Sequence, residues 1–226
     1  MKVVLGLLAL LGAVVAAPWE DDDKIIGGYE CKPHSQPWQV YFTTSGSRWC
    51  GGSLISEYWI ISAAHCYKPA EMLVAHLGEH DTAYAEGTEQ RLQVAKVISH
   101  PNYNKGNNDN DFMLVKLSTR AKFNKYVQPI KMATSCPTAG SRCLVSGWGN
   151  VLTSGVGYPV LLQCLAVPVL TRSTCTNAYP GRITKNMFCA GYMDGGKDSC
   201  KVRPPSPLQS ISHLVLLDMR DYTVYS

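Results

Sequence analysis

The chain has 226 residues, of which 46% are hydrophobic and 17% are charged, and its formal net charge is +4. This length and composition suit a single globular domain or a two-lobed one. The charge is mild and the lysines and arginines are scattered along the chain, which argues against a nucleic-acid-binding protein.

The first segment has the features of a secretory signal peptide. Lys2 supplies a positive charge, residues 3–15 form an apolar run, and the small residues Ala16 and Ala17 end it. The run is too short to span a membrane, which needs about 20 residues. We therefore predict a signal peptide over residues 1–16, secretion into the extracellular space, and no membrane partner.

The body of the chain consists of short apolar runs separated by Gly, Pro, Asn and Ser. Valine, isoleucine, tyrosine and tryptophan are common in these runs, and no long segment has the 3.6-residue period of a helix. This pattern is typical of an all-β protein with a barrel or sandwich core. The runs that we expect to form strands are 38–42, 52–55, 59–62, 92–99, 112–117, 142–146 and 163–169.

Five motifs occur in a fixed order along the chain: Ile25-Ile26-Gly27-Gly28, Trp-Cys-Gly-Gly-Ser-Leu at 49–54, Ser-Ala-Ala-His-Cys at 62–66, the segment around Asp111, and Val-Ser-Gly-Trp-Gly at 145–149. Together they resemble the trypsin branch of the chymotrypsin-like serine proteases. The resemblance covers residues 25–200. It implies two six-stranded antiparallel barrels and hydrolysis of protein substrates after Lys or Arg.

The resemblance also gives a meaning to the acidic segment 17–24. Alone, four consecutive acids and a lysine are usually a solvated run. Before Ile-Ile-Gly-Gly they resemble the activation peptide of this family's zymogens, which enteropeptidase cleaves between Lys24 and Ile25. We therefore expect a secreted, monomeric zymogen of the digestive type, which would also be a target for protein trypsin inhibitors.

Two members of a catalytic triad are implied by the resemblance. His65 matches the general base, and Asp111 matches the carboxylate that orients its imidazole ring. Asp109 is the alternative carboxylate, but Asp111 directly precedes the apolar run 112–117 and so stands at a buried strand start. Asp198 resembles the acid of a substrate pocket that selects Lys or Arg, with a solvated loop aspartate as the alternative.

The third triad member is absent from its expected place. The family's nucleophilic serine falls at Pro204, which has no hydroxyl group. The oxyanion-hole glycine falls at Val202, and the aspartate that pairs with the new N-terminus falls at Arg203. The sequence around the nearest serines, Ser199 and Ser206, does not have the pattern expected of a nucleophile elbow. The resemblance therefore predicts a catalytically inactive chain.

The last segment, residues 201–226, does not resemble the family. Three of its first seven residues are prolines, which do not continue a central strand. We expect a disordered tail, a protease domain that lacks its C-terminal part, and an incomplete second barrel.

A loop rich in acidic residues resembles the family's calcium loop. Several oxygen atoms on one loop suit a hard cation, so we expect structural calcium here, with an exposed acidic hairpin as the alternative. The expected ligands are the side chains of Glu79 and Glu89, the carbonyl groups of Asp81 and Tyr84, and the acidic neighbour Glu86.

Nine cysteines in a secreted chain indicate disulfides with at least one thiol left over. The resemblance implies three pairs: Cys31–Cys164, Cys50–Cys66 and Cys175–Cys189. It leaves Cys136, Cys143 and Cys200 without their family partners, although the first two could form a substitute bridge.

Three functions remain open from the sequence. The chain is a family member disabled by its C-terminal segment, a working trypsin-like endopeptidase if residues 201–226 do not represent the true terminus, or a non-catalytic protein that binds inhibitors or other partners.

Overall fold

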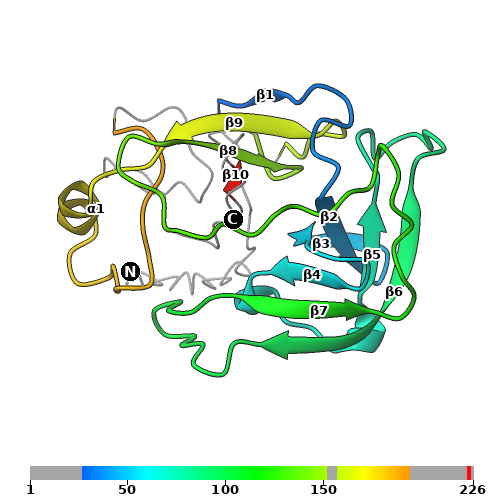
Figure 1. Ribbon diagram of the computed structural model, residues 1–226, viewed down its shortest axis with the longest axis horizontal. Coiled ribbons are helices and arrows are strands. Elements are labelled where there is room, and N and C mark those ends of the chain that lie inside the picture. The colour runs from blue at the N-terminus through cyan, green and yellow to red at the C-terminus, as the bar shows by residue number, and fades with distance from the viewer. Residues whose placement is uncertain (1–26, 152–156, 194–222, 225–226) are drawn as a thin grey trace, which may run out of the picture.

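The computed structural model describes residues 27–151, 157–193 and 223–224, whose strands form a closed barrel and a separate sheet (Figure 1). The barrel has the strand order β2-β3-β4-β7-β6-β5, and all of its neighbouring strands are antiparallel. Its strands are β2 (Gln39–Thr44), β3 (Ser47–Leu54), β4 (Trp59–Ser62), β5 (Val74–Leu77), β6 (Gln90–Ser99) and β7 (Met113–Leu117).

The second sheet has the order β1-β9-β8-β10. Its strands are β1 (Tyr29–Glu30), β8 (Arg142–Gly147), β9 (Gln163–Pro168) and β10 (Thr223–Val224). The central pair, β8 and β9, is antiparallel over six residue pairs. The two-residue strand β10 pairs in parallel with Leu144 and Val145 of β8, so this part of the C-terminal segment has a place in the sheet.

The helical elements are short. They are the 3-10 turns η1 (Ala64–Cys66) and η2 (Ala70–Met72) and the helix α1 (Arg172–Ala178). The helix begins after Thr171, whose side chain accepts a hydrogen bond from the N–H of Thr174 and so caps the first turn. Among the described residues, no helix has the length and apolar character needed to cross a membrane.

The barrel interior is filled by alternate residues of each strand. On β7, Met113, Val115 and Leu117 are buried, whereas Lys116 between them is exposed, as the two-residue period of a strand requires. Gly52 is needed where β3 and β4 meet, because a Cβ atom there would lie 2.9 Å from both Ile60 Cγ2 and Ile61 O. The packing therefore fixes how closely these two strands approach.

The all-β class is confirmed, and all seven expected runs overlap observed strands. The six-stranded antiparallel barrel is also present in the first half of the chain. The second unit is a four-stranded sheet in the described residues, where the resemblance implied a second barrel. Whether that barrel is incomplete depends on residues 194–222, which lie outside the described part of the chain.

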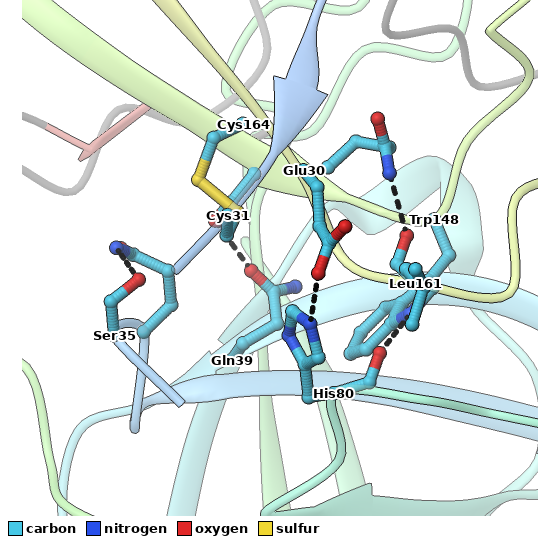
Figure 2. The surroundings of a disulfide bond; sticks show 11 residues. Glu30, Cys31, Ser35, Gln39, His80, Trp148, Leu161 and Cys164 are labelled. Carbon is cyan, nitrogen blue, oxygen red and sulfur yellow. Dashed lines mark hydrogen bonds and ion pairs between the residues drawn. A yellow bond between two sulfur atoms is a disulfide. The ribbon is translucent and has the colours of Figure 1, made fainter. Parts of the chain in front are cut away.

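Three disulfides join these elements, and they are the three pairs that the resemblance implied. Cys31–Cys164 connects the segment after β1 with β9 across 133 residues (Figure 2). Beside this bond, the Trp148 indole N–H donates to the His80 carbonyl oxygen, and His80 Nε2 lies 3.2 Å from Glu30 Oε1. The disulfide ties β1 to β9 within the second sheet, and the two contacts of His80 connect that sheet with the segment that follows barrel strand β5.

Candidate active site

The register of β4 and β7 brings the two expected catalytic residues together. These strands are antiparallel, and Ser62 at the end of β4 pairs with Met113 at the start of β7. The chain therefore leaves β4 into η1, which carries His65, at the same end of the barrel where Asp111 leads into β7. Residues 46 positions apart in sequence meet because two barrel strands are neighbours.

Asp111 contacts His65 through both carboxylate oxygens. Oδ2 lies 2.7 Å from His65 Nδ1, and Oδ1 accepts the backbone N–H of His65 at 2.8 Å. The side chain of Asp111 is only 4% exposed, whereas that of His65 is 21% exposed. A buried carboxylate at Nδ1 places the ring proton on that nitrogen, which makes Nε2 the atom that would accept a proton.

The turn that carries His65 is fixed to β3 on two sides. The Cys50–Cys66 disulfide links η1 to β3, and the Trp49 indole N–H donates to the Cys66 carbonyl oxygen at 2.8 Å. At the end of β4, the Ser62 hydroxyl donates to the Gly51 carbonyl oxygen at 2.7 Å. These contacts hold the histidine in position before any substrate is present.

Asp109, the alternative carboxylate, points to a different part of the molecule. Its oxygens accept hydrogen bonds from Thr184 Oγ1 and Asn186 Nδ2. The geometry therefore favours Asp111 as the partner of His65. The contacts of Asp109 were not predicted from the sequence, because Thr184 and Asn186 follow it by more than 70 residues.

Several expected site residues lie outside the described part of the chain. These are the activation residues Lys24 and Ile25, the pocket residue Asp198, the cysteine Cys200, and the positions Val202, Arg203 and Pro204. Their roles remain predictions from the sequence.

The acidic loop between β5 and β6 uses its carboxylates to hold its own backbone. Glu86 Oε2 accepts the N–H groups of His80 and Asp81 at 2.8 and 2.9 Å, and Glu89 accepts the N–H of Glu86. In the part of the chain that the structure describes, the one group of three potential metal-ligating side chains is Cys50, His65 and Cys66, and its cysteines form a disulfide. The loop has the oxygen ligands that calcium prefers, but no three of its carboxylates lie close enough together to form such a group.

Glu79 is buried beside the barrel and takes part in a separate cluster. Its Oε1 accepts a hydrogen bond from the Tyr41 hydroxyl at 3.3 Å and lies 3.7 Å from His76 Nδ1. The rings of Tyr41 and His76 are stacked with their centroids 4.5 Å apart. Burial, together with the charge of Glu79, raises the pKa of Tyr41 to about 12, so the phenol stays protonated and keeps donating to the carboxylate.

Two of the three cysteines left over by the resemblance are described, and both are free thiols. Cys136 is exposed, while Cys143 is buried on β8, and they do not form the substitute bridge considered from the sequence. Burial raises the pKa of Cys143 to about 11.

The two thiols should therefore react very differently with iodoacetamide. At pH 8 a thiol with a pKa of about 11 is ionised in about one molecule in a thousand, and Cys143 is also shielded from solvent. We expect peptide mapping to find Cys136 alkylated within minutes and Cys143 unmodified until denaturant is added. Equal labelling of the two in the folded protein would contradict the buried position of β8.

Comparison with known proteins gives one consistent result. A family model described as Trypsin matches residues 25–202. The chain is 55% identical over 197 residues to the "Trypsin" of Xenopus laevis, covering 87% of this chain and 79% of the relative. It is 53% identical over 195 residues to the "Anionic trypsin" of Canis lupus familiaris (86% and 78%) and 54% identical over 199 residues to "Trypsin I-P38" of Gallus gallus (87% and 79%).

Proposed function

This chain belongs to the trypsin family of serine proteases, and from that membership we propose that it is a secreted zymogen of the family that does not hydrolyse peptide bonds. The observation that carries the proposal is the formed His65–Asp111 pair. The proposal adds to it that the resemblance aligns Pro204, which has no hydroxyl group, with the family's nucleophile. The specificity inherited from the family is cleavage after Lys or Arg, with Asp198 as the residue that would bind the basic side chain.

The His65–Asp111 pair can move a proton but cannot attack a substrate. Asp111 holds the proton at Nδ1 and would stabilise the imidazolium that forms when Nε2 accepts a second proton. In the family that second proton comes from a serine hydroxyl, and Pro204 offers none. Val202 also replaces the glycine of the oxyanion hole. The match to the family model ends at residue 202, which supports the view that the nucleophile segment is not of the family type.

The activation step is proposed to fail as well. The match to the family model begins at residue 25, which is consistent with cleavage between Lys24 and Ile25 by an enteropeptidase-like protease. In the family, the new terminal ammonium group pairs with an aspartate next to the nucleophile. Arg203 stands at that position and repels the ammonium group, so cleavage would not order a substrate pocket.

The experiment that tests this proposal combines an activity assay with covalent labelling. The secreted chain is cleaved after Lys24, which is checked by N-terminal sequencing, and is given fluorogenic Lys and Arg peptides and a serine-directed phosphonate. We expect no hydrolysis above the uncatalysed rate and no phosphonate adduct. An adduct on any serine, together with turnover that stops upon labelling, would refute the proposal.

A second candidate function is retained binding of protein inhibitors. The closed barrel, the three disulfides and the fixed His65 turn support a folded surface of the family type. Isothermal titration with a protein trypsin inhibitor separates the candidates, because a binding-competent chain gives heat of association while remaining inactive. The absence of association would leave the disabled zymogen as the better description.

We also propose that the loop from Glu79 to Glu89 binds calcium. The oxygens of Glu79 and Glu89 and the carbonyl groups of Asp81 and Tyr84 would be the ligands, with Glu86 in support. Binding would require the carboxylates to exchange their present hydrogen-bond donors for the cation, whose charge favours this change.

Calcium at about 100 times its dissociation constant should stabilise the chain by about 2.7 kcal/mol, or roughly 5–10 °C in Tm. Differential scanning calorimetry with calcium or with EDTA measures this shift. Glu79→Gln should remove the shift, whereas Glu71→Gln on η2, outside the loop, should retain it. A shift that survives in Glu79→Gln would show that calcium acts elsewhere.

A further inference from the structure

Two asparagines set the backbone conformation of the loop that leads to Asp111. It joins β6 to β7, and Asn108 and Asn110 have positive φ angles of 56° and 55°. Asparagine tolerates this left-handed conformation better than most residues. Asp109 lies between the two, and its backbone is fixed as well, since its carbonyl oxygen accepts the N–H of Asn104 at 3.0 Å.

The side chain of Asp109 points out of this loop and contacts Thr184 and Asn186, which belong to a segment linked to the second sheet. Its Oδ1 accepts the Thr184 hydroxyl at 2.5 Å and the Asn186 amide at 3.1 Å, and Oδ2 lies 3.3 Å from the same Asn186 nitrogen. Asn110 Nδ2 donates to Oδ2 at 3.3 Å. One carboxylate thus gathers donors from its own loop and from a segment 75 to 77 residues further along.

The segment that supplies Thr184 and Asn186 is itself anchored to the second sheet. It lies between Cys175 of α1 and Cys189, which form a disulfide. The residue after that disulfide, Ala190, forms a β-bridge with Val169, which directly follows β9. A contact to Thr184 is therefore a contact to the second unit of the fold.

We propose that Asp109 is a positioning residue. Its hydrogen bonds with Thr184 and Asn186, which we call the latch, hold the loop that carries Asp111 against the second unit and so fix the geometry of the His65–Asp111 pair. Only Asn110 separates the latch from Asp111, and the N–H of Phe112 closes a turn on the Asn110 carbonyl oxygen at 2.9 Å. A shift of Asp109 therefore moves Asp111, whose two oxygens hold both the ring and the backbone of His65.

The charge of Asp109 fits this role. Hydrogen bonding by Thr184, together with that by Asn186, holds the pKa of Asp109 below its ordinary value, so the carboxylate is ionised at neutral pH and accepts all its donors. Charged acceptors make stronger hydrogen bonds than neutral ones, which suits a link between two units of the fold.

The inference rests on the proposed role of His65 and Asp111, but it does not need a nucleophile, so the chain can be tested as it exists. The probe is proton NMR of the hydrogen-bonded Nδ1–H of His65. Asp109→Ala should broaden this signal and speed its exchange with solvent by about tenfold, because the loop opens more often. Thr184→Val removes one donor from the other side of the latch and should have the same effect.

Two further variants distinguish the latch from a general loss of stability. Asp109→Asn keeps one oxygen that accepts from Thr184 but loses the charge and the second acceptor, so it should restore the signal only in part. Glu57→Ala, which removes an exposed acid away from the loop, should change nothing. The inference is overturned if Asp109→Ala and Thr184→Val leave the His65 signal unchanged. It is also overturned if the signal is lost only together with the dispersed resonances of the whole barrel. The phosphonate assay is independent of these outcomes, so failure of one proposal does not imply failure of the other.

Discussion

Replacing residues 201–226 with the corresponding C-terminal region of the canine anionic trypsin should convert this chain into an active peptidase. If the family resemblance holds, the replacement would supply the nucleophilic serine and the oxyanion-hole glycine that the proposal finds missing, while the His65–Asp111 pair is already formed. In a convergent Ser-His-Asp triad on an unrelated fold, loss of the nucleophile costs roughly 10⁶ in kcat, so its return should raise kcat by a similar factor. Hydrolysis of an arginine peptide after cleavage at Lys24 is the measurement.

Variants of this chimera show whether the observed pair carries the activity. Asp111→Asn should lower kcat by about 10⁴, because the amide stabilises the wrong imidazole tautomer. His65→Ala should remove nearly all activity, while Glu71→Ala on η2 should not affect it. A chimera that folds, as judged by its Tm and circular dichroism, yet stays inactive would place a further lesion within residues 25–200.

Much of the barrel could be predicted from local patterns in the sequence, and the His65–Asp111 pair from the resemblance to the family. On β7, Met113, Val115 and Leu117 alternate with polar or less buried residues, which identifies a half-buried strand without any knowledge of its neighbours. The choice of Asp111 over Asp109 also depended on a local signal, namely the apolar run that follows it. The structure pairs Asp111 with His65 at 2.7 Å.

Other parts of the fold depend on contacts that a single segment does not reveal. The strand β5 was not predicted, because its four residues include His76, and its place is set by pairing with β2 and β6. The helix α1 has seven residues, too few for a clear helical period, and a disulfide from Cys175 supports it. The Asp109 latch has no signal in the sequence beyond the asparagines around it.

The acidic loop shows what a composition pattern leaves undetermined. Its acids suggested a cation site, and their oxygens are of the right type. In the structure Glu86 instead satisfies the N–H groups of His80 and Asp81, and Glu79 faces Tyr41 and His76. The sequence shows which oxygen atoms could bind a cation. The backbone N–H groups that compete for those oxygens are seen only in the structure.

Removing the Cys31–Cys164 disulfide by a double serine substitution should destabilise the chain more than removing Cys50–Cys66. The first bond closes a loop of 133 residues and the second a loop of 16. In the chain-entropy account these loops correspond to about 5 and about 3 kcal/mol, and a typical domain has only about 5–15 kcal/mol in total.

The Cys31–Cys164 bond, which closes the longer loop, also joins β9 to the segment after β1. Its loss should therefore loosen the second sheet before the barrel. Amide hydrogen exchange during urea unfolding measures this order: protection on β8 and β9 should fall first in Cys31→Ser/Cys164→Ser, while the barrel strand β7 stays protected. In Cys50→Ser/Cys66→Ser the change should instead centre on η1 and the Trp49–Cys66 hydrogen bond. Equal losses of stability in the two variants would contradict the loop-entropy expectation. Simultaneous exchange of β7 and β9 in the first variant would mean that the two units unfold as one.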